Sequence, residues 1–142
     1  MDETIRIEYE IDGENYALAG EASADVKRVL RQLGLPADFI RRVSVAMYEA
    51  EINMVIHAHG GMALVEITAQ RVKLDLVDNG PGIPDIALAM KEGYTTASDT
   101  ARQMGFGAGM GLPNMKRYSD EIEIASEIGK GTCVSLWFTL GA

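Results

Sequence analysis

Polar and apolar residues alternate at the beginning of the chain, in TIRIEYEID, which is the two-residue period of a half-buried strand. The apolar side of this strand comprises Ile5, Ile7, Tyr9 and Ile11. The pair Asp12-Gly13 follows directly and is a turn-forming sequence. We therefore expect NYALAG, residues 15–20, to pair with the first strand as a hairpin.

In the next two segments the apolar residues recur every three to four positions, which is the period of a helix. A helix is expected from Ser23, whose side chain suits an N-cap, to Gly34, which can end it. Its apolar face comprises Val26, Val29, Leu30 and Leu33. A second, longer helix is expected at roughly residues 38–58, because Pro36 and Asp38 precede it and Gly60 follows it.

The rest of the chain alternates between strand and helix patterns. The polar segment 93–104 has low periodicity, and we expect a mobile loop there. The remaining elements expected are strands at 62–70, 72–78, 121–126 and 131–140 and short helices at 86–91 and 112–119. Strand pairs that are distant in sequence, combined with a few helices, predict a two-layer α/β sandwich that forms one domain, residues 1–142.

Composition and charge narrow the class of protein. The chain has 142 residues, of which 47% are hydrophobic, so it can bury a substantial core. Its net charge of −8 argues against a broad surface for nucleic acid or anionic membrane. It has no apolar run long enough to cross a bilayer, and its first residues are acidic, so we expect a cytoplasmic location. Cys133 is the single cysteine, which excludes an internal disulfide and a cysteine zinc site.

Basic residues gather on the two predicted N-terminal helices. They are Lys27, Arg28, Arg31, Arg41 and Arg42. Two interpretations remain open at this point. The residues form either a solvated helix face or a docking surface for an acidic partner.

Four glycines stand at alternate positions immediately before the predicted helix at 112–119. They are Gly105, Gly107, Gly109 and Gly111. Their spacing matches neither a P-loop, since no Gly-Lys-Ser/Thr follows, nor the dinucleotide fingerprint. Such glycines allow backbone N–H groups to converge on an anion at a helix N-terminus. The segment is therefore either a phosphate cradle or a flexible loop that precedes a helix.

A second motif lies on the long predicted helix. Glu49 and Asn53 are four residues apart and share one helix face, with His57 one turn further. An amide oxygen can ligate Mg²⁺ and a carboxylate can accept a proton from an attacking hydroxyl, although an ordinary polar stripe has the same pattern. Glu51 points to another face and is expected to be a surface charge. His57 and His59 are disfavoured as metal ligands, because their spacing is wrong for one helix face.

A third motif, DLVDNGPGIPD, begins at the end of a predicted strand. Asp78 is the last residue of this strand and can reach a ligand bound at that edge of the sheet. Gly80 and Gly82 allow a tight turn after it. A carboxylate at this position can accept a hydrogen bond from an exocyclic amine such as that of adenine. Alternatively, Asp78 merely initiates the turn.

The three motifs occur in a definite order along the chain. E-x-x-x-N on a helix is followed by D-x-G-x-G after a strand, by G-x-G-x-G before a helix, and by GKGT at 129–132. In this order they resemble the GHKL ATP-binding fold shared by gyrase, the chaperone of ninety kilodaltons, histidine kinases and the mismatch-repair ATPase. The resemblance covers about Val43 to Phe138 and implies a mixed, largely antiparallel sheet with helices packed on one face.

Within this family the chain looks most like the small stand-alone serine/threonine kinases of bacterial partner-switching. That group includes the anti-sigma factors and the switch-protein kinases. The likeness rests on AMKEGYTTA at 89–97 and on the long run GAGMGLPNMKRYSDEIEIASEIGKGTCV at 107–134.

The resemblance implies a role for each matching residue. Glu49 would be the general base, Asn53 the Mg²⁺ ligand, and Asp78 the adenine-binding carboxylate, with its loop shaped by the two glycines that follow. Thr132 would support the adenine site through its hydroxyl. The segment from Gly105 to Gly111, which includes Gly107, Gly109 and Met110, would be the phosphate lid. Leu112, which follows it, would also bind ATP.

Two functions are compatible with these roles. The first is a protein serine/threonine kinase that uses Mg-ATP to phosphorylate a protein partner. The second is an ATP-sensing interaction module that gates a partner with little or no phosphotransfer. The partner would be a sigma factor, an anti-sigma antagonist or another regulatory protein, and the resemblance is also compatible with a homodimer.

Overall fold

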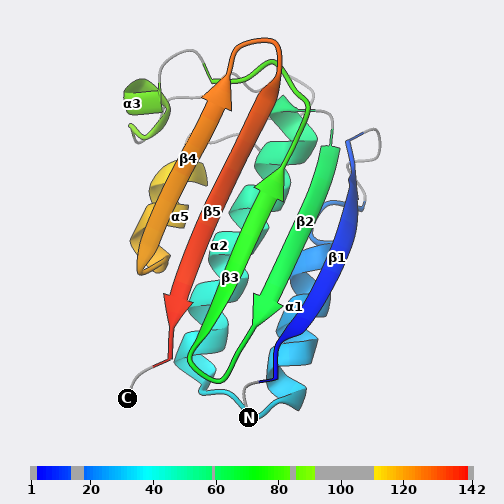
Figure 1. Cartoon of the computed structure of the whole chain (residues 1–142), viewed down its shortest axis with the longest axis vertical. Coiled ribbons are helices and arrows are strands. Elements are labelled where there is room, and N and C mark those ends of the chain that lie inside the picture. Colours follow the sequence, from blue (N-terminus) through cyan, green and yellow to red (C-terminus); the bar gives the residue numbers. More distant parts are fainter. Residues whose placement is uncertain (1–2, 14–17, 59, 84–85, 92–110, 141–142) are drawn as a thin grey trace.

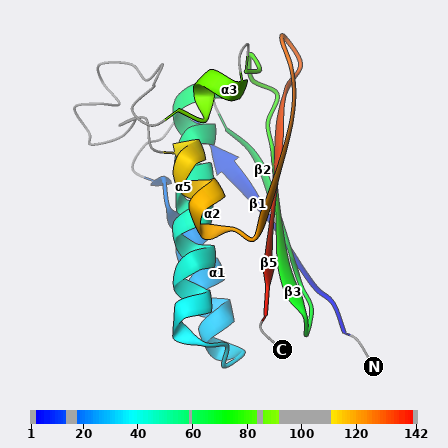
Figure 2. The same ribbon diagram turned by 90° about the vertical axis from the view of Figure 1, so that its left-hand side faces the viewer.

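Helices cover one face of a five-stranded sheet, and no described helix lies on the other face (Figure 1 and Figure 2). The computed structural model describes residues 3–13, 18–58, 60–83, 86–91 and 111–140. This arrangement confirms the predicted two-layer sandwich with helices on one face. Among the described residues, no helix is long and apolar enough to span a membrane.

The sheet has the strand order β1-β2-β3-β5-β4. Its strands are β1 (Ile5–Asp12), β2 (Gly60–Ile67), β3 (Arg71–Val77), β4 (Glu121–Glu127) and β5 (Gly131–Thr139). All four strand pairs are antiparallel, in agreement with the largely antiparallel sheet that the resemblance implied. The chain therefore crosses from β3 to the far edge of the sheet before β5 returns beside β3.

The predicted N-terminal hairpin is wrong. The partner of β1 is β2, in a register that pairs Ile5 with Ile67 and Asp12 with Gly60. Of the segment expected to pair with β1, residues 18–20 form a turn that leads into a helix. The alternation in β1 correctly predicted a strand. Pairing with β2 at eight positions is more favourable than a short hairpin with residues 15–20 would be.

The helices that the structure describes lie close to their predicted positions. They are α1 (Glu21–Gln32), α2 (Ala37–His57), α3 (Ile86–Ala89) and α5 (Gly111–Tyr118). The start of α1 differs from the prediction, because Gly20 and not Ser23 occupies the N-cap position. The Ser23 hydroxyl lies within the first turn and donates to the Gly20 carbonyl at 3.0 Å.

Glu51 supplies the cap that Ser23 was expected to provide, and its assignment as a surface charge is wrong. Its side chain is 2% exposed, and it accepts hydrogen bonds from the N–H groups of Gly20 at 2.9 Å, Ala22 at 3.2 Å and Ser23 at 2.9 Å. A carboxylate at this place satisfies N–H groups that have no partner inside the helix and lies at the positive end of its dipole. Glu51 therefore fastens the beginning of α1 to the middle of α2.

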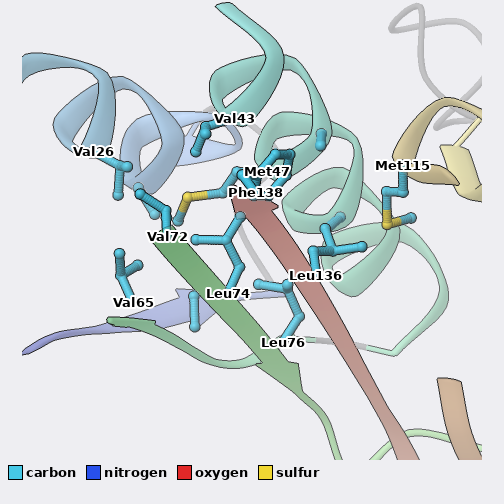
Figure 3. Packing of buried hydrophobic residues seen from close by; sticks show 14 of the residues in the cluster. Val26, Val43, Met47, Val65, Val72, Leu74, Leu76, Met115, Leu136 and Phe138 are labelled. Carbon is cyan, nitrogen blue, oxygen red and sulfur yellow. The ribbon is translucent and has the colours of Figure 1, made fainter. Parts of the chain in front are cut away.

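The core lies between the helices and the inner face of the sheet (Figure 3). Alternate residues of the central strands point into it, as the two-residue period predicts. Val72, Leu74, Leu136 and Phe138 are fully buried there. The helices cover them with Val26, Leu30, Val43, Met47 and Met115, all of them buried.

Three of the five basic residues on the N-terminal helices form ion pairs with neighbouring carboxylates. Arg28 pairs with Asp25 at 2.7 Å, and Arg41 pairs with Asp38 at 3.1 Å. Arg42 lies 3.4 Å from Asp120, which follows α5. These contacts favour the solvated helix face over the docking surface, since exposed ion pairs already neutralise much of the charge.

Candidate functional site

The long helix α2 carries Glu49 and Asn53 on the side that faces α5. Both side chains are partly buried. The Asn114 amide on the first turn of α5 donates to Glu49 Oε1 at 3.3 Å. A Cβ atom on Gly111 would lie 2.7 Å from Asn53 Oδ1 and 2.9 Å from its Nδ2, so a larger residue there would displace this amide. The beginning of α5 thus contacts both side chains of the E-x-x-x-N motif.

Asp78 follows β3 and is held at one oxygen. Its Oδ1 accepts the N–H of Gly80 at 2.8 Å and that of Thr132 at 3.2 Å, while its own N–H donates to the Thr132 carbonyl at 2.9 Å. No described residue donates a hydrogen bond to Oδ2. As far as the described ranges show, the second oxygen is therefore available to a donor from outside them.

The loop after Asp78 is fixed against the turn between β4 and β5. Gly82 has a φ of +84°, and a Cβ atom there would lie 2.6 Å from the Glu127 carbonyl oxygen, so glycine is required. The N–H of Gly129 donates to the Pro81 carbonyl at 2.9 Å. On its other side, the loop touches the residue after α2, because a Cβ on Gly80 would lie 2.8 Å from Ala58.

Thr132 lies on β5 beside this loop and is 9% exposed. Its hydroxyl is 2.8 Å from the hydroxyl of Ser126, which in turn accepts the Ile83 N–H at 2.7 Å. Sequence reasoning missed Ser126. The signal that could have found it is the β4–β5 register, which pairs Ser126 directly with Thr132.

The structure gathers the predicted residues in two adjoining groups along the C-terminal half of α2. At the beginning of α5, Asn53 meets Gly111 and Glu49 meets Asn114, and Leu112 between them in sequence is buried. At the end of β3, Asp78 meets Gly80 and Thr132, and Gly82 lies in the same loop against Glu127. Figure 1 and Figure 2 both show α5 alongside α2. The predicted lid residues Gly105, Gly107, Gly109 and Met110 lie outside the described residues, as does His59.

His57 occupies the last position of α2, and burial lowers its pKa below the ordinary value of 6.5. The neutral imidazole is therefore favoured in the folded protein. The described residues contain no group of three or more histidine, cysteine, aspartate or glutamate side chains that could hold a metal ion.

Comparison with known proteins places this geometry in context. Residues 40–142 match the family described as histidine kinase-, DNA gyrase B-, and HSP90-like ATPase. The serine/threonine-protein kinase RsbT of Bacillus subtilis is 34% identical over 110 residues, which are 75% of this chain and 77% of that protein. The anti-sigma F factor of Clostridium beijerinckii is 34% identical over 139 residues, which are 94% of this chain and 92% of that protein.

A solved structure resembles the fold. It is a crystal structure of the RsbU and RsbW domains of a Mycobacterium tuberculosis protein, with a TM-score of 0.65 and 16% sequence identity over 94% of this chain and 31% of that chain. The sequence match and the similar fold agree with the resemblance that the motifs indicated.

Proposed function

Because this chain belongs to the histidine kinase-, DNA gyrase B-, and HSP90-like ATPase family, we propose that it binds Mg-ATP and phosphorylates a regulatory protein partner on serine or threonine. The observation that carries this proposal is the pair of Glu49 and Asn53 on one face of α2, together with a carboxylate, Asp78, whose Oδ1 alone accepts hydrogen bonds from the described residues. Similarity to an anti-sigma F factor and to RsbT supports a protein as the phosphate acceptor.

Asp78 fits the amino group of adenine. Its Oδ1 is committed to two backbone N–H groups, which fix the direction of the carboxylate, and Oδ2 has no donor among the described residues. An exocyclic amine would provide that donor. The charge-assisted hydrogen bond would contribute about 1.5–3 kcal/mol to binding.

Asn53 and the beginning of α5 fit a magnesium-bound phosphate chain. The Asn53 side-chain oxygen is the kind of hard ligand that Mg²⁺ prefers, and the remaining ligands would be phosphate and water oxygens. The N–H groups of the first turn of α5 and its helix dipole favour an anion nearby. The contact between Gly111 and Asn53 brings these two features together.

Glu49 would act as the general base. The partner's hydroxyl oxygen would form a bond to the γ-phosphorus, the bond from the γ-phosphorus to the bridging oxygen of ADP would break, and the hydroxyl proton would pass to Glu49. The partner would leave as a phosphoprotein. A general base of this kind contributes about 10²- to 10⁴-fold to the rate.

Transfer of label from γ-labelled ATP to the partner tests the kinase proposal. We expect the native protein to label a candidate antagonist or sigma factor and Glu49→Ala to lose at least about 100-fold of this activity, because the proton has no acceptor. Equal labelling by both proteins would remove Glu49 from the reaction. Binding of Mg-ATP without any labelling by the native protein would instead favour the ATP-sensing module.

A further inference from the structure

We propose that Asn114 is a positioning residue, which holds the Glu49 carboxylate in the orientation that proton transfer needs. The inference rests on the proposed kinase function and deepens it, because it assigns a role to a residue outside the three motifs. Its starting point is the 3.3 Å hydrogen bond from Asn114 Nδ2 to Glu49 Oε1.

The chemistry of the two side chains fixes the direction of this bond. An ionised carboxylate only accepts hydrogen bonds, so the Asn114 atom that meets it must be the NH₂ group. Among the described residues, Asn114 makes the one hydrogen bond to the Glu49 side chain. This bond leaves Oε2 without a donor from the described part of the chain and therefore ready to receive a proton.

The amide of Asn114 is presented by a firmly packed helix. Its neighbours Leu112 and Met115 are 7% and 1% exposed, and α5 packs along α2. Met115 points into the core beside Leu136 in Figure 3. A side chain that projects from such a support holds its partner more precisely than one on a loop does.

A second contact keeps the two helices in register at this point. Gly111 lies against the Asn53 amide and Asn114 lies against Glu49. The two contact residues are three positions apart on α5, and their partners are four positions apart on α2. Both sets of positions are one turn apart on their helices. The first turn of α5 therefore fixes the base and the proposed magnesium ligand together.

Two variants of Asn114 test this role against a purely structural one. Asn114→Asp keeps the size of the side chain but replaces the donor by a negative charge, and Asn114→Ala removes the side chain. Gln70→Ala is the matched control, because Gln70 is an exposed amide in the turn before β3. We expect single-turnover phosphotransfer at saturating Mg-ATP to fall about tenfold or more in both Asn114 variants, with the dissociation constant for Mg-ATP changed less than about twofold.

Loss of ATP affinity in parallel with transfer, or full transfer by Asn114→Asp, would overturn the positioning role while leaving the kinase proposal intact. Failure of the native protein to transfer phosphate to any partner would overturn both. These outcomes separate an error in this inference from an error in the proposed function.

A stability cycle provides a measurement that does not depend on activity. The Asp side chain of Asn114→Asp would lie against Glu49, so we expect a lower midpoint of thermal unfolding that Glu49→Gln in the same chain largely restores. The Gln70→Ala change should show no such coupling with Glu49→Gln. Strictly additive shifts for Asn114→Asp and Glu49→Gln would show that the two side chains do not meet, and the inference would fail.

Discussion

At the scale of single residues, the described part of the chain holds each of the two proposed site carboxylates at one oxygen. Asp78 Oδ1 accepts two backbone N–H groups, and Glu49 Oε1 accepts the Asn114 amide. Glu51, only two residues from Glu49, uses both oxygens to accept N–H groups of α1 and its cap. The number of uncommitted oxygens, more than the residue type, separates a candidate functional carboxylate from a structural one.

Replacement of Asp78 by asparagine should weaken ATP binding without unfolding the protein. Asn can still accept the two backbone N–H groups through its oxygen, but its NH₂ group would then face the amino group of adenine. We expect the dissociation constant for Mg-ATP to rise at least about tenfold, which corresponds to about 1.4 kcal/mol. Titration calorimetry would measure the change directly.

Asp38→Asn is the control for this measurement, since Asp38 is an exposed residue at the first turn of α2 and pairs with Arg41. It should leave the affinity unchanged. If Asp78→Asn binds Mg-ATP as tightly as the native protein does, Asp78 does not contact adenine.

Part of the candidate site could be predicted from residue spacing alone. Spacing on one helix placed Glu49 beside Asn53, and the end of a strand placed Asp78 at the sheet edge. Ser126 and Asn114 were missed, because Ser126 accepts from Ile83 and Asn114 donates to Glu49, and both partners are distant in sequence. The misassignment of Glu51 has the same cause, since helical periodicity does not show that a second helix begins against that face.

At the scale of elements, α1 and α2 are joined by a buried charge. The Glu51 carboxylate is buried against the beginning of α1, where three N–H groups satisfy it. Glu51→Gln would remove the charge and place a donor against these donors. We expect the free energy of unfolding to fall by about 1.5–3 kcal/mol, the range for hydrogen bonds to a charged group. Urea denaturation would measure it.

Glu123→Gln on the exposed side of β4 is the comparison for this change, because its side chain is exposed. It should alter stability by less than about 0.5 kcal/mol. Similar free energies of unfolding for Glu51→Gln and Glu123→Gln would mean that the hydrogen bonds of Glu51 to α1 do not stabilise the protein.

The existence and type of most elements followed from the sequence, but their partners did not. Helical spacing predicted α2 and alternation predicted β1 and β5, because these patterns are local. The choice of β2 over residues 15–20 as the partner of β1 depends on burial of the whole sheet face, which a local turn signal does not report. The start of α1 likewise depends on Glu51, which lies on another helix.

At the scale of the whole molecule, sheet and helices share one core, and we predict that they unfold together. Trp137 on β5 reports on the sheet by fluorescence, and far-ultraviolet circular dichroism reports mainly on α1 and α2. Both signals should give the same urea midpoint, as expected for a domain of this size. Two separate midpoints would show that the helical layer and the sheet are independent folding units.

The pairing of β1 with β2 dictates the order in which a nascent chain can complete its sheet. The strand made first meets its partner only after α1, α2 and β2 have been translated, since Ile5 pairs with Ile67. Closing so long a loop costs chain entropy before the new contacts offset it. Until then the apolar side of β1 is uncovered at the ribosome, where a chaperone could shield it from other unfinished chains.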